Sequence, residues 1–463
     1  MRWIKLTMVV LLMLLAGLQL GVFTSANSNP YQTVQVDSWP LTEDTSESKR
    51  WTLYDPDPDH LWNRLYRALY QRVARNGKEY GYDELDPILW STSKYLLAGQ
   101  SYQKASTLLD EFLSTHAENT IKDPIKRVIF QRDLWAIFDW TAEVQIDSPE
   151  KLNLQIKLAE VMKRLALSRV EILSLPDAYK EAVTSNEFPA IYDLNRRERP
   201  FLPPDLFDPQ GPWVKLSGRG SVPIAMTHVN ESSGRSVFLV FMLLPGGRDA
   251  TFKYLVKLSE FPKPWIPDQD DPRRLVPNPD LPQFPVGTQL ALVRMIVLVD
   301  KDGNFQPTKL VEDVQVRIHR AIPSESPEGL RTDRNPARTA LDVYEFKLSR
   351  VKLFAQESGG LQPLAKDDTE FPLFMSHNVD LFESSTRESS VERELRAPLK
   401  SCSSCHFRPG VHSMLSRGRG EIVPSSDPNA ETNATKSWKG MQYNWGLLQG
   451  IWFTNQKSAS ATN

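Results

Sequence analysis

Apolar residues recur at helical spacing from about residue 60 to residue 179. The stretch HLWNRLYRALYQRVA, which begins at His60, gathers one apolar stripe: Leu61, Leu65, Ala68, Leu69 and Val73. YQKASTLLDEFLSTHA and RVIFQRDLWAIFDWTAEVQ show the same behaviour further along the chain. Another helix is expected after Ser148, because serine suits the cap position and Pro149 suits the first turn. This region predicts four or five helices.

The pattern changes after a proline-rich connection at residues 196–212. RSVFLVFMLLP and TFKYLVKLS are apolar, β-like runs separated by Gly246 and Gly247. LALVRMIVLVDKDGNFQPTKLVEDVQVRIHRAI predicts two strands joined by a turn at Asp302 and Gly303, and LDVYEFKLSRVKLF alternates well enough to be another strand. Several strands at this spacing predict an antiparallel sheet or sandwich over roughly residues 210 to 356.

These changes predict a multidomain α+β protein, with an N-terminal helical domain, a middle antiparallel β-sheet or sandwich and a separate C-terminal segment. The predicted segments are 1–26, a signal peptide; 27–58, an extended lead-in; 59–195, the helical domain; 196–360, the β-rich domain; and 361–463, the C-terminal segment.

The first residues have the layout of a secretory signal peptide. Arg2 and Lys5 precede an apolar run, 8–23, and Thr24 and Ala26 stand where a small-x-small cleavage site needs them. An uncleaved anchor is the alternative, but this run of 16 residues is shorter than the roughly 20 that span a bilayer. We expect an exported protein without an integral membrane segment after cleavage.

Charge says little about partners, whereas the cysteine count is informative. The formal net charge is −2, with 55 basic and 57 acidic residues, so neither nucleic-acid binding nor an acidic interaction tail is indicated. The chain has 2 cysteines in 463 residues, which excludes the disulfide framework common in exported proteins.

Both cysteines lie in SCSSCHFRPGVHSM, residues 401 to 414. Two thiols separated by two residues suit addition to the two vinyl groups of one haem, and an adjacent histidine is then held beneath the iron. In this motif the chain resembles the c-type cytochromes, and the resemblance covers only the motif and its surroundings. It implies a C-terminal haem-binding segment in which Cys402 and Cys405 carry one covalent haem c and His406 is the proximal iron ligand.

Two other uses of the cysteines compete with haem attachment. A thioredoxin-like redox pair needs the cysteines at a helix start within an α/β unit, but Pro398, Pro409 and Gly410 surround them here. The related alternative is a structural disulfide between the two cysteines, without redox activity. Zinc binding is disfavoured because exported thiols oxidise and His406 directly follows Cys405.

The sixth iron position separates an electron carrier from a small-molecule site. A downstream methionine often fills it in small c-type cytochromes, so the resemblance favours Met441, and His412 is the other main candidate. His377, Met375 and an open position also stay possible.

Three functions are compatible with these features. The preferred one is an electron-transfer protein of a bacterial periplasm or cell envelope, which implies a redox partner protein and an electron carrier rather than a catalyst. The second is an open-site haem enzyme or sensor with a peroxidase-like or gas-binding activity. The third is an envelope binding or scaffold protein whose Cys402 and Cys405 form a disulfide.

Overall fold

The computed structural model describes residues 51–73, 79–83, 95–218, 220, 222–261, 263–322, 340–365, 373–374, 395–396, 406, 410–415 and 422–460. The chain divides into two compact units, Met1–Ser46 and Glu47–Asn463, and all described residues belong to the second. The predicted signal peptide, 1–26, lies outside the described residues. The described end of the predicted lead-in, 51–58, brings Trp51 and Tyr54 into the core.

The first half of this unit is helical, as the apolar spacing predicts. Ser148 caps α5 by accepting a hydrogen bond from the Lys151 backbone amide, and Pro149 occupies the first turn, which confirms the predicted helix start. The helices are α2 (Leu61–Tyr70), α3 (Gly99–Ser114), η3 (Ala117–Asn119), α4 (Pro124–Glu143), α5 (Pro149–Leu165), α6 (Arg169–Leu173) and α7 (Ala178–Thr184); a short pair, β1 (Arg72–Val73) and β2 (Glu79–Tyr80), follows α2.

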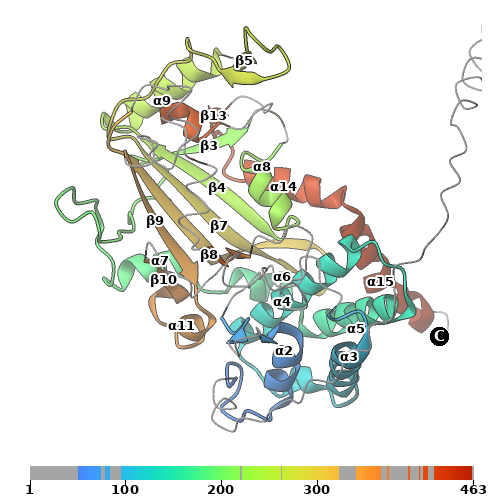
Figure 1. Ribbon diagram of the computed structural model, residues 1–463. Helices are drawn as coiled ribbons and strands as arrows, with labels where there is room; N and C mark the ends of the chain where they lie inside the picture. Colours follow the sequence, from blue (N-terminus) through green and yellow to red (C-terminus); the bar gives the residue numbers. More distant parts are fainter. Residues whose placement is uncertain are drawn as a thin grey trace, which may run out of the picture. The chain divides into compact units, whose positions relative to one another are not determined.

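The second half is built on a seven-stranded antiparallel sheet of order β10-β9-β8-β7-β4-β3-β13, seen obliquely in Figure 1. The strands are β3 (Val214–Gly218), β4 (Ser236–Leu243), β7 (Gln289–Val299), β8 (Phe305–His319), β9 (Leu341–Leu348), β10 (Leu361–Pro363) and β13 (Ile422–Pro424). The predicted α+β class and the predicted hairpin around Gly303 are confirmed. Both edge strands, β10 and β13, come from the predicted C-terminal segment.

One predicted strand is wrong, and another ends earlier than predicted. TFKYLVKLS belongs to helix α9 (Gly247–Ser259), which buries Thr251, Tyr254, Leu255 and Leu258 at helical spacing. The end of LDVYEFKLSRVKLF leaves β9 and forms helix α11 (Arg350–Phe354), capped by the Ser349 hydroxyl, which accepts from the Lys352 amide. A short apolar run fits the repeat of a helix and the repeat of a strand equally well, so its packing decides which element forms.

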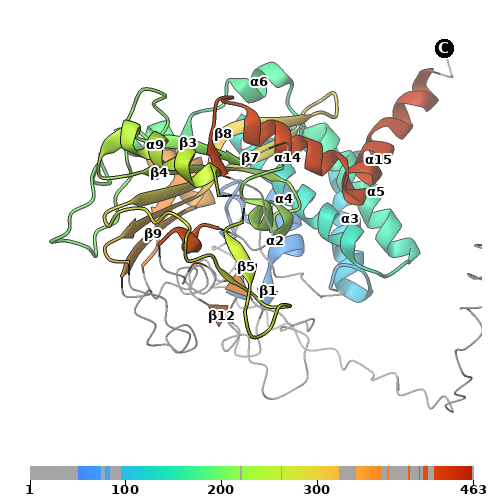
Figure 2. The same ribbon diagram turned by 90° about the horizontal axis from the view of Figure 1, so that it is seen from above.

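The remaining elements surround the sheet. They are α8 (Met226–Glu231), β5 (Trp265–Pro267), β6 (Leu275–Pro277), η5 (Ser358–Gly360), β11 (Leu373–Phe374), β12 (Leu395–Arg396), η6 (Gly410–Ser413), α14 (Ala430–Gly440) and α15 (Tyr443–Ser460). Figure 2 shows α14 continuing into α15; α14 contacts β4, and α15 contacts α4 and α5.

One face of the sheet shares a hydrophobic core with the helices. Val314, Val316 and Ile318 alternate along β8 on this face and are buried in the same cluster as the interiors of α2 to α5. Gln131 of α4 joins the halves directly: its Nε2 donates to the Val299 carbonyl at 2.8 Å, and its Oε1 accepts from the Val299 amide at 3.2 Å. The predicted boundary between residues 195 and 196 therefore falls inside one compact unit, and separate helical and β-rich domains stay a prediction.

The opposite face carries a different set of side chains. Part of it is apolar, where Met242 and Leu290 pack with α9 and with Val411 of η6. The odd-numbered residues of β8 also lie on this face and are polar, yet all four are less than 9% exposed: Asp313, Gln315, Arg317 and His319. This buried polar face positions the candidate site.

Candidate functional site

The structure describes three of the five residues proposed from the sequence. His406, His412 and Met441 are described, whereas Cys402 and Cys405 lie outside the described residues. The further candidates His377 and Met375 lie outside them as well. His406 is therefore the described residue of the CxxCH motif.

The His406 ring is held in one orientation by the backbone of η6. Its Nδ1 lies 2.7 Å from the carbonyl oxygen of Ser413. A carbonyl only accepts, so Nδ1 carries the hydrogen and donates it. In the neutral ring the lone pair then resides on Nε2, which is the common arrangement of a metal-binding histidine.

Arg317 of β8 fixes the charge state of this ring. Its Nη1 donates to the same Ser413 carbonyl at 3.2 Å. The positive charge of Arg317, and then burial, lower the pKa of His406 to about 3, although the hydrogen bond to Ser413 acts the other way. His406 is therefore neutral at pH 7, the form that binds metals.

A second histidine from a distant part of the chain lies beside His406. The ring of His228, in α8, is nearly parallel to that of His406, with 9° between the planes and 6.2 Å between ring centroids. Burial and then the charges of Arg317 and Arg294 lower the pKa of His228 to about 4. Two neutral imidazoles thus meet above the polar face of the sheet.

A third histidine completes the group. His319 lies two residues after Arg317 on β8, with its Nε2 3.4 Å from the Ser413 hydroxyl oxygen and its ring edge-on to Phe284. Burial, followed by Arg317, lowers the pKa of His319 to about 3. Ser413 consequently contacts His406 through its carbonyl and His319 through its side chain.

The first residues of η6 are fixed to the loop that precedes β7. Gly410 has φ +58°, in the left-handed region, and a Cβ there would come within 2.2 Å of the Gln283 side chain. The next amide, of Val411, donates to Gln283 Oε1 at 2.7 Å, and the Val411 side chain is buried. The left-handed backbone at residue 410 therefore favours glycine.

The two candidate sixth ligands lie in different surroundings. His412 is part of η6, and its ring meets Trp265 edge-on at 5.4 Å between centroids. Met441 follows α14, and 74% of its side chain is exposed. Among the contacts of the described residues, none joins Met441 to His406.

Sequence reasoning missed His228 and His319. Side chains alternate between the two faces of a strand, so the sequence of β8 already placed Arg317 and His319 on the same face. No local pattern pointed to His228, which precedes His406 by 406 − 228 = 178 positions. Its proximity depends on the sheet and on α8.

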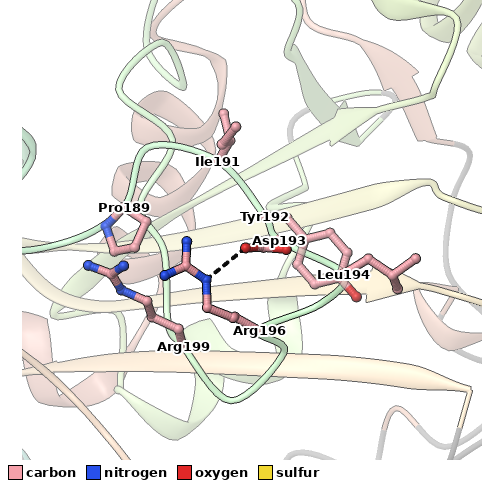
Figure 3. A pocket seen from close by; sticks show the side chains of 7 residues that line it. All are labelled: Pro189, Ile191, Tyr192, Asp193, Leu194, Arg196 and Arg199. Carbon is pink, nitrogen blue, oxygen red and sulfur yellow. Dashed lines mark hydrogen bonds and ion pairs between the residues drawn. The ribbon is translucent and has the colours of Figure 1, made fainter.

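A separate pocket of about 300 Å³ lies on the loop between α7 and β3 (Figure 3). Its lining residues are Pro189, Ile191, Tyr192, Asp193, Leu194, Arg196 and Arg199. Asp193 is already paired with Arg196 at 2.9 Å, and the histidine group contributes nothing to this pocket. We assign it no chemistry.

Two features are absent from the described ranges. Within the described ranges, no cluster of three or more His, Cys, Asp or Glu side chains is placed to hold a metal ion; the two cysteines are not in those ranges. In the same part of the chain, no helix combines the length and apolarity needed to cross a membrane.

The described side chains around His406 fit an axial ligand of haem, because they hold a neutral imidazole with its Nε2 lone pair in a partly buried place. Comparisons with protein-family models, with curated proteins and with solved structures found no match for this chain.

Proposed function

We propose that this protein is an exported, c-type cytochrome-like protein that carries one covalent haem c and transfers electrons in a bacterial cell envelope. The observation that carries the proposal is the tautomer of His406: Nδ1–H donates to the Ser413 carbonyl, which leaves Nε2 as the ligating atom. His406 directly follows the two cysteines of the CxxCH motif.

Covalent attachment needs only the haem and the two reduced thiols. At Cys402 and at Cys405 an S–H bond adds across one vinyl double bond, so that a C–S bond and a C–H bond form and nothing leaves. The resulting thioether links would hold the haem beside His406. The predicted signal peptide supports this proposal, because it would deliver the thiols to a haem-maturation pathway outside the cytoplasm.

The chain's own residues would set the properties of the site. Arg317 keeps His406 uncharged, and the Ser413 carbonyl fixes the ring's rotation. The bound haem would supply a one-electron iron centre. A largely water-excluded setting and a histidine-rich neighbourhood suit electron exchange with a protein redox partner better than an open catalytic iron.

The test is expression with a c-type haem maturation system, followed by intact mass and absorption spectra. We expect one covalent haem in the wild type and none in Cys402→Ala/Cys405→Ala. Ser403→Ala, which changes the residue between the cysteines, is the matched control and should keep the haem. A haem-free wild type that is lighter by the two hydrogens of a disulfide would support a scaffold function instead.

A further inference from the structure

We infer that His228 of α8 is the second axial ligand of the haem iron, on the side opposite His406. The inference rests on the proposed function and deepens it, because it names the residue that makes the iron six-coordinate. It also joins the CxxCH segment to a helix that precedes it by more than a third of the chain.

The spacing of the two rings carries this inference. Metal–imidazole bonds are about 2.0–2.1 Å long, and the ring nitrogen lies roughly 1.1 Å from the ring centre, so two imidazoles on one metal have centroids about 6.3 Å apart. The centroids of His228 and His406 are 6.2 Å apart. Atoms of rings in face-to-face contact would be only about 3.5–4.0 Å apart, so this distance is too long for a simple stack.

The relative orientation agrees with the spacing. Two imidazoles that bind one iron from opposite sides each contain the axis through the metal, and a 9° interplanar angle corresponds to their nearly parallel arrangement.

The protein holds His228 in place through its own helix. The next residue, Val229, is fully buried, and its carbonyl accepts from the Gly234 amide at 2.8 Å, which closes the end of α8. The His228 ring also contacts Phe238 of β4 at 5.4 Å between centroids. A ligand held this way loses little conformational freedom on binding.

The other described candidates are engaged elsewhere. His319 directs Nε2 at the Ser413 hydroxyl, His412 lies against Trp265, and the Met441 side chain is mostly exposed. Of these three residues and His228, it is His228 whose ring lies beside that of His406.

The experiment compares the haem-loaded wild type with His228→Ala by absorption and electron paramagnetic resonance spectroscopy, with intact mass as a check on haem content. We expect a low-spin wild type and a high-spin His228→Ala protein that binds carbon monoxide once its haem iron is reduced with dithionite. Added imidazole should restore the low-spin spectrum. His412→Ala is the matched control and should stay low-spin.

His228→Met guards against a folding failure in the alanine variant. Because methionine opposite histidine raises the reduction potential of a haem, this variant should stay low-spin with a higher potential than the wild type. A haem-loaded protein that is high-spin in the wild type, or that stays low-spin in His228→Ala, would overturn the assignment of His228. Absence of covalent haem from the wild type would instead overturn the proposed function.

Discussion

Single residues set the charge of this site. His406, His319 and Arg317 contact Ser413, and His228 lies beside His406. The Arg317 guanidinium disfavours a positive charge on each of the three imidazole rings. Neutral imidazoles therefore depend on Arg317 and on burial together, rather than on a property of histidine that the sequence displays.

His319 allows this electrostatic account to be tested by stability. Its pKa is about 3 in the folded protein and about 6.5 in an unfolded chain, so between these values the unfolded state binds more protons. The contribution of His319 is fully present above pH 6.5 and is lost as the pH falls toward 3. At about 1.4 kcal/mol per pKa unit, the loss amounts to at most about 5 kcal/mol.

His319→Gln should therefore flatten the acid side of the stability curve. The measurement is urea unfolding at a series of pH values from 7 to about 4, where the variant should lose less free energy of unfolding than the wild type. His116→Gln is the control, because the His116 side chain is 67% exposed. Parallel curves for wild type and His319→Gln would contradict the burial of a neutral His319.

At the scale of elements, close backbone contacts fix how short helices pack. Gly359 of η5 has φ +59°, and a Cβ there would lie 1.9 Å from the Ala178 carbonyl oxygen at the start of α7. The glycine thus meets two requirements, a left-handed backbone and space for a neighbouring main chain.

Gly359→Ala should destabilise the protein by more than about 2 kcal/mol, because the backbone of α7 has to move in addition to the strain at φ. Gly99→Ala is a matched control: Gly99 has φ +66° but no atom within 4 Å of the added Cβ, so it should cost only about 1 kcal/mol. Thermal unfolding of the two variants measures the difference. Equal losses would show that φ alone matters at Gly359.

At the scale of the whole molecule, helices and sheet share one hydrophobic cluster. Residues of α2 to α5 and the inner faces of β7, β8 and β9 contribute to it, and Gln131 adds hydrogen bonds to Val299 across the junction. Removing either half would expose the apolar surface of the other, so the two halves depend on each other for stability.

We expect the described helices and sheet to unfold in a single cooperative transition. Near-ultraviolet and far-ultraviolet circular dichroism should give coincident curves. Gln131→Ala should shift both curves together by about 1–3 kcal/mol, because it leaves buried backbone groups of Val299 unpaired. Two separate transitions, with only one moved by Gln131→Ala, would instead support the separate helical and β-rich domains predicted from the sequence.

The sequence by itself determined the features that depend on neighbouring residues. The start of α5 follows from Ser148 and Pro149, and the β7–β8 hairpin follows from two apolar runs around Asp302 and Gly303. The CxxCH motif consists of consecutive residues and needs no structure to be identified. Caps, turns and periodic burial act over a few residues, so their signals are local.

The tertiary structure decided what depends on distant contacts. It made a helix of residues 247–259, whose apolar pattern also suits a strand, because α9 packs against the sheet. It also placed His228 beside His406 by ordering β8, β7 and β4 as neighbours and setting α8 against β4. The contact between His228 and His406 depends on the packing of the whole core. The local repeat of apolar residues does not specify which distant residues this packing brings together.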